Sequence, residues 1–165
     1  GDDLEVIVNA IDKTAVSMKI KDKDVNMTFM LADLSVIRQV PDLKNTPDWN
    51  ASIEITKDFT TKFIKAKNAL PESENFGLKC TDETVEMIIN YSTINTNRIK
   101  FEIESKGSTD MPVICFSSTL FKEILQANKD ATSGKLEISS AGLARVTFNS
   151  KDYSSTYYLV QLQTA

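Results

Sequence analysis

The sequence predicts an α+β protein in which two helices lie on one face of antiparallel sheets. Three observations carry this prediction. A unit of one strand, one helix and three strands occurs twice, each helix follows a hydroxyl residue suited to cap it, and apolar residues alternate along the strand segments. Two such β-α-β-β-β units in tandem are expected to share one hydrophobic core.

The first unit begins with the segment "ASIEITKDFTTKFIKAKNALP". Thr56 is a suitable N-cap, and Pro71 is expected to stop the helix that follows. The apolar residues of this helix recur at helical spacing and are expected to be buried: Phe59, Phe63, Ala66 and Leu70. Three strands are then expected at "FGLKC", "TVEMIIN" and "RIKFEIES", with polar turns between them.

The second unit repeats this order from "MPVICFSSTLFKEILQANKD" onward. Ser117 is the expected N-cap of its helix. Aligning the two helices places apolar residues at equivalent positions, which predicts that three residues are buried: Leu120, Ile124 and Ala127. The strands that complete this unit are expected at "KLEIS", "LARVTFN" and "TYYLVQLQ".

The N-terminal segment has the strands of a third meander, at "LEVIVN", "AVSMKIK" and "VNMTFMLA", without a preceding strand and helix. The chain is therefore expected to begin within a unit. Residues 1–36 are interpreted as the last three strands of an N-terminal domain, and residues 53–165 as a complete C-terminal domain. Residues 37–52 are the expected connector, which holds the only tryptophan and two of the four prolines.

Composition argues against most enzyme mechanisms. Histidine is absent, which removes the commonest general base and metal ligand. Cys80 and Cys115 stand alone in apolar runs and are expected to be free core thiols rather than disulfide or metal ligands. Glu102 and Glu104 share a strand face and are interpreted as solvating residues rather than a catalytic pair. We therefore expect a soluble, intracellular, non-enzymatic protein without cofactor or metal, and the lack of a long apolar run predicts no membrane span.

The side of each helix opposite its apolar stripe carries lysines and no acid, although the net charge of the chain is -4. In the first helix these positions are Lys57, Thr61, Lys65 and Asn68, and in the second they are Ser118, Lys122, Gln126 and Lys129. Two interpretations stay open. The stripes are either ordinary solvated helix faces or a weak surface for the phosphates of nucleic acid, without the arginines or aromatic residues that read bases.

The order of these elements resembles the sliding clamps that act as DNA polymerase processivity factors, most closely those of T-even-type phages. The resemblance rests on "MTFMLADLSVI" with the following connector, on "TKDFTTKFIKAKNAL", and on "GKLEISSAGLARVTFNSKDYSSTYYLVQLQ". It implies the DNA-clamp fold and a homo-oligomeric ring, a trimer in the phage members, that encircles duplex DNA. It also implies a DNA polymerase and a clamp loader as partners, and a cytoplasmic location, that of the host for a phage protein.

The resemblance further implies roles for three groups of residues. The residues facing DNA are Lys57, Lys62, Lys65, Lys67, Lys122 and Lys129. The subunit interface pairs the strand segments 25–31 and 98–104, with the residues Val25, Met27, Phe29, Leu31, Ile99, Phe101 and Ile103. The groove for partner tails consists of Val40, Leu43, Trp49, Tyr158 and Leu159.

Two alternatives remain beside this interpretation. Trp49 either lines the partner groove or anchors the connector to the sheet. The whole chain is either a clamp or a clamp-derived, β-rich protein-interaction module that does not bind DNA. Binding of peptides without any dependence on DNA would favour the second.

Overall fold

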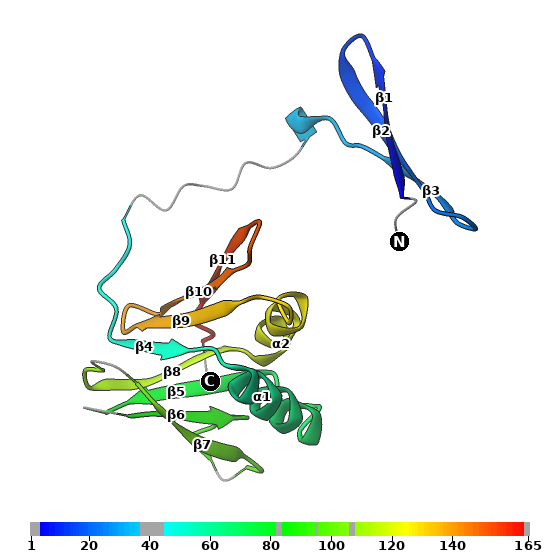
Figure 1. Cartoon of the computed structure of the whole chain (residues 1–165). Helices are drawn as coiled ribbons and strands as arrows, with labels where there is room; N and C mark the ends of the chain where they lie inside the picture. The colour runs from blue at the N-terminus through cyan, green and yellow to red at the C-terminus, as the bar shows by residue number, and fades with distance from the viewer. Residues whose placement is uncertain (1–3, 37–44, 82–83, 95, 106–107, 164–165) are drawn as a thin grey trace. The chain divides into compact units, whose positions relative to one another are not determined.

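The computed structural model of the chain describes residues 4–36, 45–81, 84–94, 96–105 and 108–163. The chain divides into two compact units, residues 1–44 and residues 45–165. Figure 1 shows the strands and helices of both units. In the described part of the chain, no helix has the length and apolar character needed to cross a membrane.

The first unit is an antiparallel meander. It consists of β1 (Glu5–Ile11), β2 (Thr14–Lys21) and β3 (Asn26–Met30) in the order β1-β2-β3, followed by the short 3-10 helix η1 (Leu34–Val36). The register places apolar residues of all three strands on one face: Val6, Val8, Met18, Ile20, Met27 and Phe29. Among the described side chains of this unit only Ser17 is buried, so this apolar face is open to solvent.

The second unit has the predicted succession of elements. They are β4 (Ala51–Glu54), α1 (Lys57–Ala69), β5 (Asn75–Cys80), β6 (Thr84–Ile89), β7 (Ile99–Glu104), β8 (Met111–Ser117), α2 (Ser118–Ala127), β9 (Ser133–Ser139), β10 (Leu143–Asn149) and β11 (Ser154–Val160). They form two four-stranded antiparallel sheets with the orders β11-β10-β9-β4 and β7-β6-β5-β8. The first strand of each repeat therefore pairs with the meander of the other repeat, which ties the two repeats into one core.

Four phenylalanines form the centre of this core. Phe63 of α1 and Phe121 of α2 meet edge to face with ring centroids 4.8 Å apart, and Phe76 of β5 lies 5.3 Å from Phe63 and 5.0 Å from Phe121. Phe116 of β8 packs against Phe76 at 5.9 Å. Both helices are thus fixed to the sheets, and to each other, through aromatic contacts.

Both predicted helix caps are confirmed. The hydroxyl of Thr56 accepts a hydrogen bond from the amide of Phe59 at 3.1 Å, and the hydroxyl of Ser117 accepts one from the amide of Leu120 at 3.3 Å. In α1 the predicted apolar stripe also faces the core, with Phe59, Phe63 and Ala66 buried.

The predicted buried face of α2 is wrong for Leu120 and Ala127, whereas Ile124 is partly buried against the core as expected. Leu120 is 53% exposed and Ala127 is exposed, whereas Phe121 and Leu125 are buried. The alignment assumed that both helices present equivalent positions to the core. Instead α2 is turned about its axis so that Phe121 reaches Phe63, and the hydroxyl of Ser118 is buried and donates to the carbonyl of Ser73 at 2.6 Å.

Candidate nucleic-acid interface

The helices α1 and α2 lie side by side on the same side of the two sheets (Figure 1). A hydrogen bond joins their outer surfaces, in which the Lys122 ammonium donates to the Asn68 side-chain oxygen at 2.7 Å. The exposed sides of the two helices therefore form one continuous surface. We call it the helix surface and define its cations as Lys57, Lys62, Lys65, Lys122 and Lys129.

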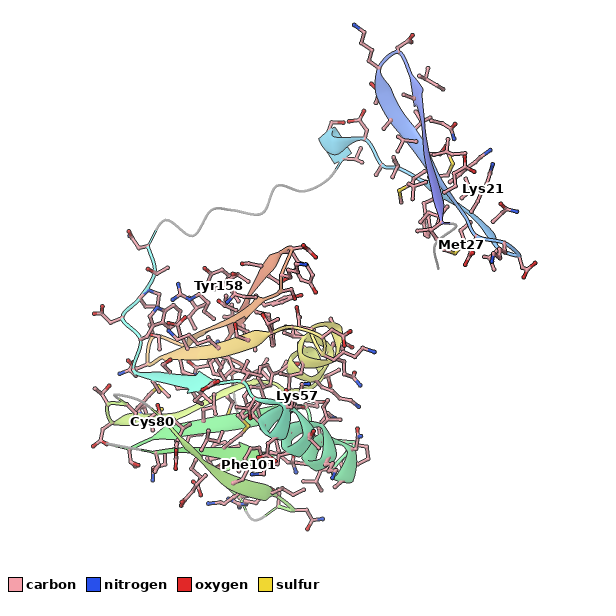
Figure 2. The ribbon with its side chains drawn as sticks, viewed as in Figure 1. Lys21, Met27, Lys57, Cys80, Phe101 and Tyr158 are labelled. Atoms are coloured by element: carbon pink, nitrogen blue, oxygen red, sulfur yellow. The ribbon has the colours of Figure 1, made fainter. Side chains whose placement is uncertain are left out.

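The charge of the helix surface is positive. Lys57, which Figure 2 labels at the start of α1, is exposed, as are Lys65 and Lys129. Among the described residues, no carboxylate lies within 4.0 Å of these three ammonium groups. Lys62 is partly neutralised because its ammonium lies 2.7 Å from the Asp58 carboxylate one turn earlier, and both side chains are exposed. Three lysines are thus free to meet an external anion.

Two residues expected on this surface are not there. Lys67 is 7% exposed, and its ammonium donates to the carbonyl of Pro71 at 2.7 Å, so it satisfies the end of α1 instead of facing outward. Ser118, the first residue of α2, is fully buried. The signal for Lys67 was its place in the last helical turn, next to the buried Ala66 and four residues before Pro71.

The connector meets the sheet β11-β10-β9-β4 through Trp49. The guanidinium carbon of Arg145 lies 4.7 Å from the centre of the Trp49 ring. Arg145 also donates to a carboxylate oxygen of Glu137 at 2.6 Å, and Lys135 donates to the other at 2.8 Å. We call these four residues, together with Tyr158, the Trp49 cluster. Sequence reasoning missed Arg145 and Glu137, although both lie at outward alternating positions of β9 and β10.

The ionisation of Glu137 depends on its two cations. Burial by itself raises the pKa of this carboxyl, but the hydrogen bonds from Arg145 and Lys135 outweigh it and lower the pKa below its ordinary value. The hydrogen bond to Glu137 in turn raises the pKa of Arg145. A hydrogen bond to Tyr158 raises the pKa of Arg145 as well. Trp49 is therefore stacked on a cation that is held in place by a buried carboxylate.

The structure separates the expected partner-groove residues. Tyr158 (Figure 2) is 40% exposed and pairs with Arg145 on the outer face of the sheet. Leu159 is only 5% exposed, because neighbouring strand residues point to opposite faces, and it belongs to the core opposite Ala144. Leu159 therefore lies on the other face from Tyr158 and is removed from the groove. Val40 and Leu43 lie outside the described residues.

The two strands expected at a subunit interface are both edge strands, β3 in the first unit and β7 in the second. Met27 and Phe29 of β3 are 44% and 46% exposed. Val25 and Leu31 flank β3 and are exposed as well. On β7 three apolar residues face the core and are half-buried: Ile99, Phe101 and Ile103. A hollow of about 1330 Å³ lies against β7, and Phe59, Phe101 and Ile103 form its apolar part.

No protein-family model matches the sequence, and no curated protein matches it either. Solved structures do match. The PCNA of A. fulgidus, solved with the C-terminal region of FEN-1 bound, has a TM-score of 0.70 at 17% identity, over 98% of this chain and 64% of that one. The chain has the sliding-clamp fold. The α+β DNA-clamp prediction is therefore confirmed.

Two further clamp structures agree. The proliferating cellular nuclear antigen of Entamoeba histolytica has a TM-score of 0.65 at 15% identity, over 99% of this chain and 66% of that one. The DNA polymerase III subunit beta of Pseudomonas aeruginosa has a TM-score of 0.64 at 11% identity, over 97% of this chain and 42% of that one. This chain spans less than two thirds of the length of each of the three clamps. The likeness to phage clamps is not tested by these structures and stays a prediction.

Proposed function

We propose that this chain acts as a sliding clamp, which encircles duplex DNA as a homo-oligomeric ring and tethers a DNA polymerase for processive synthesis. The observation that supports this most is the helix surface, where the ammonium groups of Lys57, Lys65 and Lys129 have no carboxylate within 4.0 Å among the described residues. A trimer and a clamp loader follow from the resemblance to phage clamps.

The chemistry of the helix surface suits sliding. Each lysine near a phosphate releases a counterion, which gives weak, salt-dependent and sequence-independent contacts. The helix surface carries no arginine and no aromatic side chain, so it offers neither the bidentate nor the stacking contacts that hold particular bases. Retention on DNA then comes from enclosure and not from affinity.

The remaining parts of the chain take their roles from the same proposal. Residues 1–36 are the last strands of an N-terminal clamp domain, residues 37–52 are the connector, and residues 53–165 are a complete C-terminal domain. Subunits join through β3 and β7. Trp49 and Tyr158, with Val40 and Leu43 of the connector, receive the tail of a partner such as the polymerase.

The test is retention on circular duplex DNA at increasing salt. We expect Lys65→Glu with Lys129→Glu to lower retention at low salt by about tenfold or more and to reduce its salt dependence, because about one counterion is released for each phosphate contact. Lys79→Glu with Lys151→Glu is the matched control, since both lysines are exposed and lie outside the helices. Equal retention by the two double variants would refute DNA binding through the helix surface.

A protein-interaction module is the second candidate, and the Trp49 cluster favours it. This cluster exposes Tyr158 beside a stacked tryptophan and is built without any residue of the helices. Because Trp49 is the only tryptophan, its fluorescence reports directly on peptide binding there. Peptide binding by a chain that does not retain DNA would select this candidate over the clamp.

A further inference from the structure

We propose that β7 pairs with β3 of a second copy of this chain in one antiparallel register, with Thr28 opposite Glu102. Two rows of side chains that run across the paired strands select this register, because each row brings a lysine of β2 together with a glutamate of β7. The inference rests on the proposed ring. It goes beyond it by naming the register and the residues that determine it.

The free backbone groups of β3 belong to alternate residues. The amide of Leu31 donates to the carbonyl of Val16 on β2 at 2.9 Å. Since the direction of these groups alternates along an antiparallel strand, those of Met27 and Phe29 also point to β2. The N–H and C=O groups of the other residues point to the open edge: Asn26, Thr28 and Met30.

The free groups of β7 follow from its neighbours in the same way. The amide of Asn90, at the end of β6, donates to the carbonyl of Asn75 on β5 at 3.0 Å. By alternation, Val85 and Met87 bond toward β7, where they pair with Ile103 and Phe101. The backbone groups that remain for a new strand are those of Lys100, Glu102 and Glu104. These residues and the three free residues of β3 can therefore exchange backbone hydrogen bonds as direct pairs.

The outer side of β7 has uncompensated negative charge. Glu102 lies directly opposite Glu86 of β6, an unfavourable pair of like charges. The Lys100 ammonium lies 2.9 Å from Glu86 and is thereby engaged. Among the described residues no cation lies within 4.0 Å of Glu102 or Glu104. The edge therefore favours a partner strand that brings positive charge.

The edge formed by β3 brings that charge from the strand behind it. On β2, Lys19 lies opposite Thr28 and Lys21 lies opposite Asn26. Lys19 has no carboxylate within 4.0 Å among the described residues, and Lys21 (Figure 2) has only the exposed Glu5 at 3.4 Å. Because Thr28 and Asn26 are short, the long lysine side chains can extend across β3 to the edge beyond it.

Antiparallel pairing of Thr28 with Glu102 completes both rows. Lys19 then shares a row with Glu102, and Lys21 shares a row with Glu104. Strands two apart are separated by about 10 Å, a distance that lysine and glutamate side chains can close together. A shift of two residues that sets Thr28 opposite Lys100 would place Lys19 and Lys100 in one row. The opposite shift sets Thr28 opposite Glu104 and leaves Glu102 without a lysine in its row.

Parallel pairing gives a poorer fit. If Thr28 lay opposite Glu102 in a parallel pair, Asn26 would lie opposite Lys100. Lys21, which lies beside Asn26, would then share a row with Lys100, a cation of the same sign. The parallel register that matches the charges would instead leave Phe29 and Met30 beyond the end of β7. The antiparallel register is the one that satisfies both the charges and the full length of the two strands.

The apolar faces agree with the same register. It sets Met27 beside Ile103 and Phe29 beside Phe101, so that the core face of β7 continues onto the open face of the first unit. Phe101 and Ile103 are half-buried at the hollow of about 1330 Å³ that Phe59 also lines (Figure 2 labels Phe101 and Met27). In this register the exposed side chains of β3 thus meet residues of the β7 face that the second unit leaves partly open.

A charge swap tests the rows, with self-association measured by sedimentation velocity. We expect Lys19→Glu and Glu102→Lys each to raise the dissociation constant per interface by roughly threefold to tenfold, and the two together to restore it to within about twofold. Lys151→Glu, in the turn between β10 and β11, is the control for net charge. Single variants that associate like this control, a double variant that does not recover, or a wild-type chain that is monomeric at every concentration would overturn the proposal.

A disulfide tests the register itself. Met27 and Ile103 would form a non-hydrogen-bonded pair, whose Cα distance of about 4.5 Å suits a disulfide. We expect a mixture of Met27→Cys chains and Ile103→Cys chains to give a cross-linked dimer, and a mixture of Met27→Cys with Phe101→Cys to give much less. Burial raises the pKa of Cys80 and of Cys115 to about 11, so the native thiols react slowly. Equal cross-linking in both mixtures, or none in the first, would contradict this register.

Failure of the register and failure of the clamp have different signatures. If DNA retention depends on Lys65 and Lys129 but the charge swap does not recover association, the clamp stands and the register is wrong. If the swap recovers association while Lys65→Glu with Lys129→Glu retains DNA like its control, strand pairing stands and the clamp is wrong.

Discussion

At the scale of single residues, Glu137 shows how a buried charge holds a surface element. Its carboxylate accepts hydrogen bonds from Lys135 and Arg145, and the guanidinium of Arg145 stacks on the Trp49 ring. The carboxylate is 8% exposed, whereas the lysine is half exposed, so the bond to Arg145 contributes more than the bond to Lys135. The cation on which the Trp49 ring stacks is thus held in place by one ionised side chain.

The pH dependence of stability follows from Glu137. Its pKa is lower in the folded than in the unfolded chain, so its contribution is complete above the ordinary value of 4.5 and is lost as pH falls through the folded pKa. We expect Glu137→Gln to lower the free energy of unfolding at pH 7 by about 1–3 kcal/mol, because Arg145 loses its carboxylate. Below pH 4.5 the difference between variant and wild type shrinks, as urea titrations followed by Trp49 fluorescence will measure. A constant difference across this range would contradict the assignment.

At the scale of elements, the sequence predicted where helices begin more reliably than which way they face. Thr56 and Ser117 were identified correctly because capping is local chemistry, between one hydroxyl and an amide three residues on. The face of α2 depends instead on a distant contact, that of Phe121 with Phe63. Lys67 and Leu159 were misplaced although local signals were present. Lys67 stands four residues before Pro71, whose carbonyl its ammonium binds, and Leu159 follows the outward Tyr158 on β11 and so points to the other face.

The orientation of α2 gives a prediction about neighbouring residues. Phe121 is fully buried among aromatic rings, and Leu120 is more than half exposed. We expect Phe121→Ala to lower the free energy of unfolding by about 3–5 kcal/mol and Leu120→Ala by less than about 1 kcal/mol. Urea denaturation monitored by circular dichroism measures both. A larger cost at Leu120 would show that α2 has the orientation expected from the aligned repeats.

The exchange of first strands between the repeats was also beyond the reach of periodicity. Alternation identified β4 and β8 as strands, but not that β4 pairs with β9 and β8 with β5. These pairings are long-range and leave no local pattern in the sequence. Each repeat depends on the other for the closure of its sheet, so the second unit is expected to unfold as one body.

At the scale of the whole molecule, the two units differ in how much they bury. The second unit encloses a continuous core that draws on both sheets and both helices. In the first unit, the apolar face of the meander is open, and a three-stranded sheet with one uncovered face has little burial to stabilise it. The first unit is therefore expected to gain stability from association, and the second to keep its own.

Amide hydrogen exchange measures this difference directly. In dilute solution we expect the amides of β1, β2 and β3 to exchange much faster than those of β5, β6, β9 and β10, because local opening of the first unit exposes little new apolar surface. Raising the protein concentration should then slow exchange at Thr28 and Met30 and at Glu102 and Glu104, whose amides face the open edges. The edge strand β11 provides the internal control and should keep its exchange rates. If exchange slows at β11 but not at β3 and β7, the subunits associate through the edge of β11 instead. Full protection of β3 in dilute solution would show that its edge is closed within a single chain.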